Sequence, residues 1–151
     1  SVPDSPFFRV HFFGESPLPP ISQAISLLTD KAKICIDDVI YDKAEGKVEI
    51  TMQRKRLVRF RKSILGKTQP VYSQSMVKSL LIIRLVEEMS IKVDDRLAKD
   101  CNSCFTVLFG LRLNGNNLYI GSVEEAQGDF LCQIHIKVGR INLELCDVEK
   151  I

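Results

Sequence analysis

Residues 130–148 read FLCQIHIKVGRINLELCDV, and this stretch carries the clearest structural signal in the chain. Apolar and polar side chains alternate on both sides of the pair Gly139-Arg140, a pattern typical of two strands joined by a two-residue type II′ turn. We therefore predict a β-hairpin in which Val138 faces Ile141. This register places six apolar residues on the core side of the hairpin: Ile134, Ile136, Val138, Ile141, Leu143 and Leu145.

The outer side of the predicted hairpin would carry Gln133, His135, Glu144 and Cys146. His135 would lie opposite Glu144 in this register. A His–Glu pair across a solvated sheet face contributes at most about 1 kcal/mol, so we interpret it as structural. A general-base role would need a nucleophile or a substrate pocket beside the imidazole. His11, in a proline-rich stretch, has no such neighbours in the sequence pattern.

Two earlier segments, residues 34–52 and 105–123, predict further hairpins with four-residue loops. The acids Asp37 and Asp38 interrupt the first of these and indicate a β-bulge. The predicted apolar pairs across the strands are Val39 with Ile50, Tyr41 with Val48, Leu111 with Ile120, and Leu113 with Leu118.

Residues 76–93 fit two interpretations, because they are apolar nearly all round as a helix and apolar on both faces as a strand. Their β-branched content favours a strand. The preceding residues 63–75 are rich in Ser, Gln and Thr and predict a loop. The apolar positions Ile21, Ile25, Leu28 and Ala32 recur at the helical period, which predicts a short amphipathic helix over residues 22–31.

Residues 1–20 hold five of the six prolines together with four phenylalanines, and we predict an irregular arm there. Residues 21–151 are then a single β-rich domain, since 151 residues fit the usual size of one domain. The fold class that we predict is mainly β: an antiparallel sandwich or partly open barrel of about seven or eight strands with one short N-terminal amphipathic helix.

Positive charge is concentrated in one part of the chain. The net charge is only +2, but residues 47–67 contain eight Lys or Arg and the single acid Glu49. An edge strand protected from aggregation by charge would show this composition. The alternative is anion or nucleic-acid binding, with arginines contacting phosphates and an aromatic ring stacking on a base. The residues that would bind the anion are Arg54, Lys55, Arg56, Arg59, Phe60, Arg61 and Lys62.

Five cysteines is an odd number and favours reduced thiols in a cytoplasmic protein. Cys101 and Cys104 form a CxxC motif, which in other contexts is a redox pair or half of a zinc site. Two more zinc ligands would be needed, and Cys132 and Cys146 fall on opposite faces of the predicted hairpin. We therefore interpret the cysteines as ordinary thiols and expect no metal, with Cys101 and Cys104 as the fallback ligands.

No run of about 18 apolar residues exists, so no membrane association is expected. The sequence has no phosphate-binding glycine pattern, GxSxG, HExxH or EF-hand motif, so it predicts neither an enzyme nor a cofactor. The function that we expect is a non-catalytic binding or assembly module, with a protein partner or a second copy of itself. The alternatives are anion or nucleic-acid binding through residues 54–62, and a Cys-dependent metal or redox protein.

Overall fold

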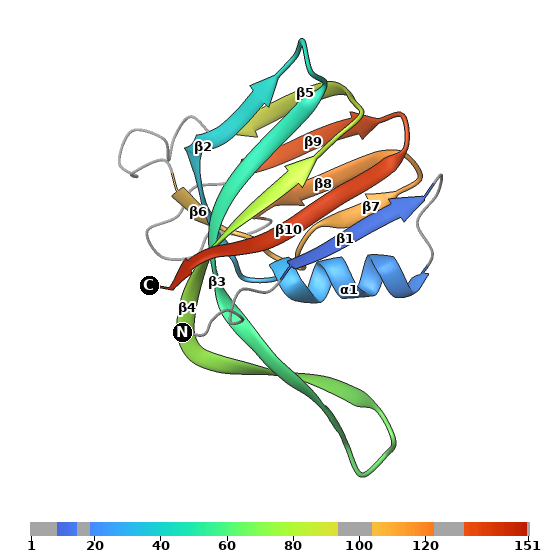
Figure 1. Cartoon of the computed structure of the whole chain (residues 1–151), viewed down its shortest axis with the longest axis vertical. Coiled ribbons are helices and arrows are strands. Elements are labelled where there is room, and N and C mark those ends of the chain that lie inside the picture. Colours follow the sequence, from blue (N-terminus) through green and yellow to red (C-terminus); the bar gives the residue numbers. More distant parts are fainter. Residues whose placement is uncertain (1–8, 15–18, 94–103, 123–131, 151) are drawn as a thin grey trace.

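A computed structural model describes residues 9–14, 19–93, 104–122 and 132–150, which form ten strands and one helix (Figure 1). The larger antiparallel sheet has six strands, in the order β1 (Arg9–Gly14), β10 (Ile141–Lys150), β4 (Thr68–Ile83), β3 (Lys47–Lys62), β2 (Lys33–Asp42) and β6 (Cys104–Thr106). The smaller has four, in the order β5 (Val86–Val93), β9 (Cys132–Val138), β8 (Asn117–Gly121) and β7 (Arg112–Asn114). The predicted mainly β class is confirmed: the sheets are two, antiparallel, and not a closed barrel.

Apolar side chains from both sheets form one buried cluster. The alternation within residues 130–148 correctly predicted which of these residues belong to the cluster, because all six that were expected to face the core are buried. Burying one such aliphatic side chain contributes about 1.5–3 kcal/mol. The cluster also contains, from the neighbouring strands, Val48, Ile50, Met52, Leu81, Ile83, Leu118 and Ile120.

The predicted hairpin itself is wrong. Strand β9 pairs with β5 and β8, whereas β10 pairs with β1 and β4, so Gly139-Arg140 connects the two sheets instead of turning within one. A second connection between the sheets lies beside it at Arg84-Leu85, and Gly139 N donates a hydrogen bond to Leu85 O at 2.9 Å. Alternation fixes which side chains face the core, but it does not fix which strands pair.

The predicted strand over residues 105–113 is also broken. Strand β6 of the larger sheet ends at Thr106, and Phe109 and Gly110, with φ values of 66° and 69°, then turn the chain before β7 starts in the smaller sheet. A Cβ on Gly110 would lie 2.1 Å from the Ser26 carbonyl oxygen, so the close approach of this segment to the helix requires glycine. The pair Leu113 with Leu118 is confirmed, whereas Leu111 lies before β7 and outside the ladder.

Strands β2 and β3 pair as predicted, with Val39 opposite Ile50 and Tyr41 opposite Val48. The register shifts between Ile34 and Val39, where the bulge was expected. Residues 76–83 and 86–93 are strands, in agreement with the favoured interpretation. The loop predicted over residues 63–75 is wrong from Thr68 onward, because β4 begins there.

The single helix α1 (Pro19–Thr29) begins three residues before the predicted start. Proline is compatible with the first helical turn, where the backbone N–H has no partner within the helix. Arg9–Gly14 form strand β1 on β10, so this part of the expected irregular arm is regular. The division of the chain into arm and domain at residue 20 stays a prediction. Among the described residues, no helix is long and apolar enough to cross a membrane.

Candidate functional site

The basic stretch lies on a hairpin that extends away from both sheets (Figure 1). Strand β2 pairs with β3 only as far as Gln53. Beyond that residue β3 continues to Lys62 and pairs with β4 alone, from Lys55 opposite Met76 to Lys62 opposite Thr68. We call residues 55–76 the basic hairpin. Both long edges of this two-stranded ribbon are free of further strands among the described residues.

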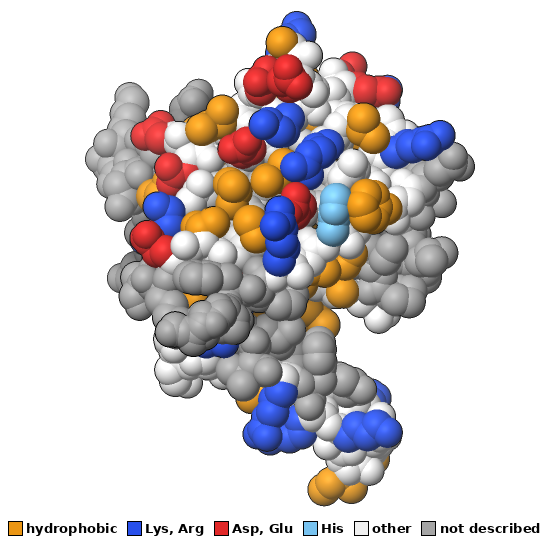
Figure 2. Space-filling view, viewed as in Figure 1, with side chains coloured by type: hydrophobic (Ala, Val, Ile, Leu, Met, Phe, Trp, Pro, Cys, Tyr) orange, Lys and Arg blue, Asp and Glu red, His pale blue; other side chains and the backbone are white. Residues whose placement is uncertain are grey.

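Positive side chains line the basic hairpin and no negative one does. The sequence has no Asp or Glu between Glu49 and Glu87. The hairpin carries six cations, of which Arg56 is half-buried and the others are exposed: Lys55, Arg56, Arg59, Arg61, Lys62 and Lys67. None of the six forms an ion pair with a described residue. Figure 2 shows Lys and Arg side chains, in blue, on the lower projection, with hydrophobic side chains at its end.

Arg54 does not belong to this surface. It is 1% exposed, and its Nη2 lies 2.6 Å from Asp147 Oδ1. Its Nε donates to Ser79 Oγ at 2.9 Å, and Ser79 Oγ donates to Asp147 Oδ1 at 2.6 Å. The alternation that buries Val48, Ile50 and Met52 continues to Arg54, so a polar network closes the end of the core. The prediction of Arg54 as an anion-binding residue is therefore wrong.

Strand β3 does not alternate regularly between two faces over residues 54–62. The register of β3 against β4 shifts between Lys55 and Leu57 and again between Leu57 and Arg59, so alternate residues do not share a face across these positions. The backbone of Phe60 lies opposite Pro70; its side chain lies outside the described residues, so base stacking there stays a prediction.

The root of the basic hairpin is attached to the helix. Tyr72 Oη donates to the Leu27 carbonyl oxygen at 2.7 Å. Burial raises the pKa of Tyr72, and the charge of Asp30 raises it further, so the phenol stays protonated as a donor. A groove of about 250 Å³ lies beside this contact, lined by Leu28, Asp30, Lys31, Lys55, Tyr72 and Met76.

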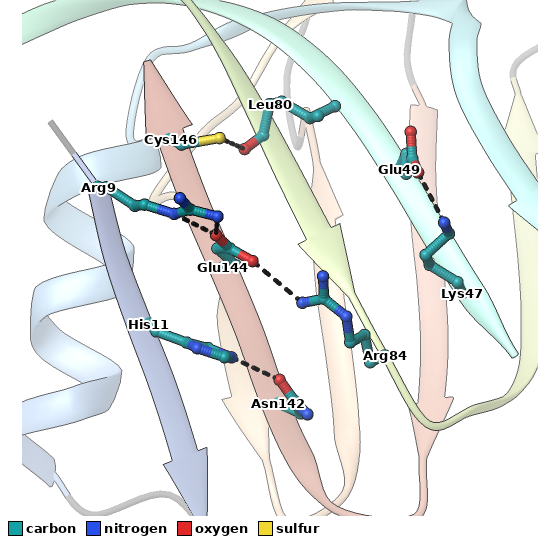
Figure 3. Close-up of polar contacts among 9 residues, drawn as sticks. All are labelled: Arg9, His11, Lys47, Glu49, Leu80, Arg84, Asn142, Glu144 and Cys146. Atoms are coloured by element: carbon teal, nitrogen blue, oxygen red, sulfur yellow. Dashed lines mark hydrogen bonds and ion pairs between the residues drawn. The ribbon is translucent and has the colours of Figure 1, made fainter. Parts of the chain in front are cut away.

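The outer face of the larger sheet has its own polar cluster (Figure 3). Glu144 lies between Arg9 and Arg84, which both donate to its carboxylate, Arg84 at 3.2 Å. The hydrogen bond from Arg9 and then that from Arg84 lower the pKa of Glu144, against the opposing effect of desolvation. His11 lies 2.7 Å from Asn142 Oδ1. The carboxylate, the two guanidinium groups, the imidazole and the amide are thus paired with one another, and the thiol of Cys146 beside them lies 3.8 Å from the Leu80 carbonyl oxygen.

His135 does not lie opposite Glu144, and the predicted pair is wrong because the two residues belong to different sheets. Its Nε2 lies 2.8 Å from Asn117 Oδ1, and its ring stacks on Tyr119 with 4.8 Å between the centroids. A shallow hollow of about 360 Å³ adjoins the imidazole, lined by Ser90, Lys92, Tyr119, Gln133 and His135. The described lining includes no acid that would act with the imidazole.

Cys104 is bonded to Cys35 in a disulfide across β2 and β6, which corrects the expectation of ordinary reduced thiols. The two cysteines are 69 residues apart, and β6 was not predicted to pair with β2, so no local pattern indicated that they would be joined. Cys101 lies outside the described residues, and the CxxC chemistry stays untested. With Cys35 and Cys104 oxidised, the cysteines no longer favour a cytoplasmic location.

Cys132 and Cys146 are free. Burial raises the pKa of Cys132 to about 12, so its thiol is protonated near neutral pH. No group of three or more His, Cys, Asp or Glu side chains lies close enough to hold a metal ion in the part of the chain that the structure describes.

The fold and the site together define a mainly β, two-sheet protein with a projecting basic hairpin. Comparisons with protein-family models, curated proteins and solved structures gave no match, so the geometry alone carries the functional argument. Sequence reasoning located the cations of β3 but missed Lys67 and the apolar tip residues Ile64 and Leu65. An apolar pair next to Gly66, where turn-forming polar residues are usual, was the available signal.

Proposed function

We propose that this protein is a non-catalytic nucleic-acid-binding module and that the basic hairpin contacts the phosphate backbone. The observation that carries the proposal is the placement of six Lys or Arg side chains, and no acid, on a ribbon that leaves both sheets. A ribbon that only protected a sheet edge would not need to extend eight or more residues past its neighbour. Because both long edges of the basic hairpin are free of further strands among the described residues, an extended polyanion can lie along either of them.

The expected strength of binding follows from counterion release. Each phosphate that a protein cation neutralises on duplex DNA contributes a slope of about −0.9 to log K against log salt concentration. Five or six contacts correspond to a slope of about −5, or roughly a thousandfold loss of affinity between 50 and 200 mM salt. The binding that we propose is therefore strong at low salt and independent of base sequence.

The base of the hairpin supports the proposal because it is held in place on two sides. The Arg54, Ser79 and Asp147 network ties the start of the hairpin to β10, and Tyr72 ties it to α1. We infer that the two sheets pack as a sandwich and act as a rigid mount. A mounted ribbon loses less conformational entropy on binding than a free basic tail does.

The test is fluorescence anisotropy with a labelled 20-base-pair duplex over a series of salt concentrations. The variant R59Q/R61Q/K62Q removes three cations from the hairpin. Its matched control, K43Q/K92Q/K137Q, removes three exposed lysines from elsewhere on the protein. We expect the hairpin variant to bind at least tenfold more weakly at 100 mM salt. The slope of log K against log salt concentration should become about 2.7 less negative. Equal binding by the two variants, or no binding by the wild type at low salt, would refute the proposal.

A second candidate function is self-association through the outer face of the larger sheet. Phe13 and Ile40 are 62% and 60% exposed, and Leu80 and Ile82 between them are half-buried. Figure 2 shows hydrophobic side chains beside charged ones on this face, and exposed apolar side chains rimmed by polar ones mark interaction surfaces. Light scattering would test it: we expect a dimer that I40D/I82D converts to a monomer, and a monomeric wild type at 100 μM would refute it.

A further inference from the structure

The tip of the basic hairpin is a hydrogen-bonded turn that presents two aliphatic side chains to solvent. Ser63 N donates to Lys67 O at 2.8 Å, Gly66 N donates to Ser63 O at 2.9 Å, and Lys67 N donates to Ser63 Oγ at 3.2 Å. Gly66 has a φ of 80°, which glycine adopts at little cost. Ile64 is fully exposed and Leu65 is 84% exposed.

These two side chains do nothing for the fold of the protein. They bury almost no area, so their hydrophobic contribution to folding is near zero. Turn positions favour Gly, Asn, Asp, Ser and Pro, and the closed hydrogen bonds of this turn do not depend on an aliphatic pair. Lys62 and Lys67 flank the pair, so the apolar end is surrounded by positive charge.

We infer that Ile64 and Leu65 form a wedge that enters a DNA duplex between base pairs and bends it, an inference that rests on the nucleic-acid function proposed above. Aliphatic side chains that insert at a base step unstack it and kink the duplex by 20–90° in other proteins. The cations behind the tip would hold the phosphates on either side of the step. Single strands are instead held on aromatic platforms, and the two tip side chains are aliphatic.

The distribution of charge favours a duplex over an anionic membrane as the partner of the tip. Lys55 and Arg56 lie about eight residues behind the tip, roughly 25 Å along an extended strand. This exceeds the Debye length of about 8 Å at physiological salt, so a lipid surface touched by the tip would leave them unengaged. A duplex that lies along the ribbon meets every cation of the hairpin.

The experiment uses the full chain and a 20-base-pair duplex with a fluorophore at each end and 2-aminopurine at its centre. We expect the wild type to raise the energy transfer between the ends, which reports bending, and the 2-aminopurine fluorescence, which reports unstacking. The variant I64S/L65S should lose both signals and bind 3- to 30-fold more weakly with an unchanged salt slope. The matched control L85S/F109S, which removes two exposed apolar side chains from the body of the protein, should behave as the wild type.

The possible outcomes separate the two proposals. Salt-dependent binding in which I64S/L65S bends and unstacks the duplex like the wild type would overturn the wedge and leave the nucleic-acid function standing. A wild type that shows no salt-dependent binding would overturn both. A separate assay measures binding to vesicles of phosphatidylserine and phosphatidylcholine. If I64S/L65S loses vesicle binding while its DNA bending is unchanged, the tip is a lipid-binding element and the wedge is wrong.

Discussion

Arg54 Nη2 lies 2.6 Å from Asp147 Oδ1, and both side chains are almost completely buried at the end of the core where the basic hairpin begins. This ion pair separates one structural arginine from the exposed cations that follow it in the same strand. The chain therefore contains adjacent basic residues with different roles: Arg54 holds the hairpin root, and Lys55 and the cations beyond it are free to meet a ligand.

Replacing Arg54 should destabilise the protein strongly. R54M leaves the Asp147 carboxylate buried without its cation, and breaking a buried ion pair in this way costs about 3–5 kcal/mol. R59M, which changes an exposed arginine of the same strand, should shift the free energy of unfolding by less than about 0.5 kcal/mol. Urea denaturation followed by circular dichroism measures both. Equal stability of the two variants would show that the ion pair does not hold the fold.

The double variant R54M/D147L supplies the second test of this pair. Removing both charges leaves no uncompensated carboxylate, so we expect it to recover most of the stability that R54M loses. If R54M/D147L is as unstable as R54M, the loss comes from packing and not from the buried charge.

The disulfide between Cys35 and Cys104 should stabilise the protein through the length of chain that it closes. A loop of 69 residues corresponds to about 4 kcal/mol in the chain-entropy treatment, and measured values are commonly about 2–4 kcal/mol. C35S should lower the free energy of unfolding by that amount. Dithiothreitol should lower the free energy of unfolding of the wild type and leave that of C35S unchanged. Thiol titration of the unfolded, unreduced protein would count two fewer thiols than the reduced protein. An equal count in both would contradict the bond.

Much of the core could be read from the sequence, and much of the strand pairing could not. The alternation from Ile134 to Leu145 gave the buried positions, because the period of two is set locally by the backbone. Whether Val138 pairs with Ile141 depends on strands far away in the sequence. Strand β5 pairs with β9 in the smaller sheet, and β4 pairs with β10 in the larger one. The local pattern is the same for a turn within one sheet and for a connection between two.

The candidate site was found in part for a similar reason. The density of Lys and Arg over residues 54–62 located the positive surface. The contact of Arg54 with Asp147 depends on how the core-facing side chains of β3 and β10 meet, and only the structure shows this. The strand from Thr68 to Ser75 was missed because its described side chains are half-buried or exposed and none is fully buried, so burial imposes no alternation on them. The tip was missed with it.

Glu144 should make stability depend on acidity. Its folded pKa lies below the ordinary value near 4.5, because Arg9 and Arg84 favour the carboxylate. The stabilisation is therefore fully present above the unfolded pKa and is lost as the pH falls through the folded pKa. Free energies of unfolding measured from pH 7 to pH 3 should fall less steeply in E144Q than in the wild type. E49Q, which changes an acid in the more exposed pair with Lys47, is the control and should follow the wild type. Parallel curves for E144Q and the wild type would contradict the pKa shift.

The basic hairpin should be removable without loss of the fold. Lys55 pairs directly with Met76, so replacing residues 56–75 with Asn-Gly closes the two strands with a favoured two-residue turn. The deletion removes five cations and the hydrogen bond from Tyr72 to Leu27, a loss of about 1 kcal/mol, while the apolar cluster shared by the sheets is untouched. We expect cooperative unfolding close to that of the wild type together with complete loss of salt-dependent duplex binding in the anisotropy assay. A shortened protein that folds and still binds the duplex would place the nucleic-acid site elsewhere, whereas one that does not fold would show that the hairpin supports the core from which it projects.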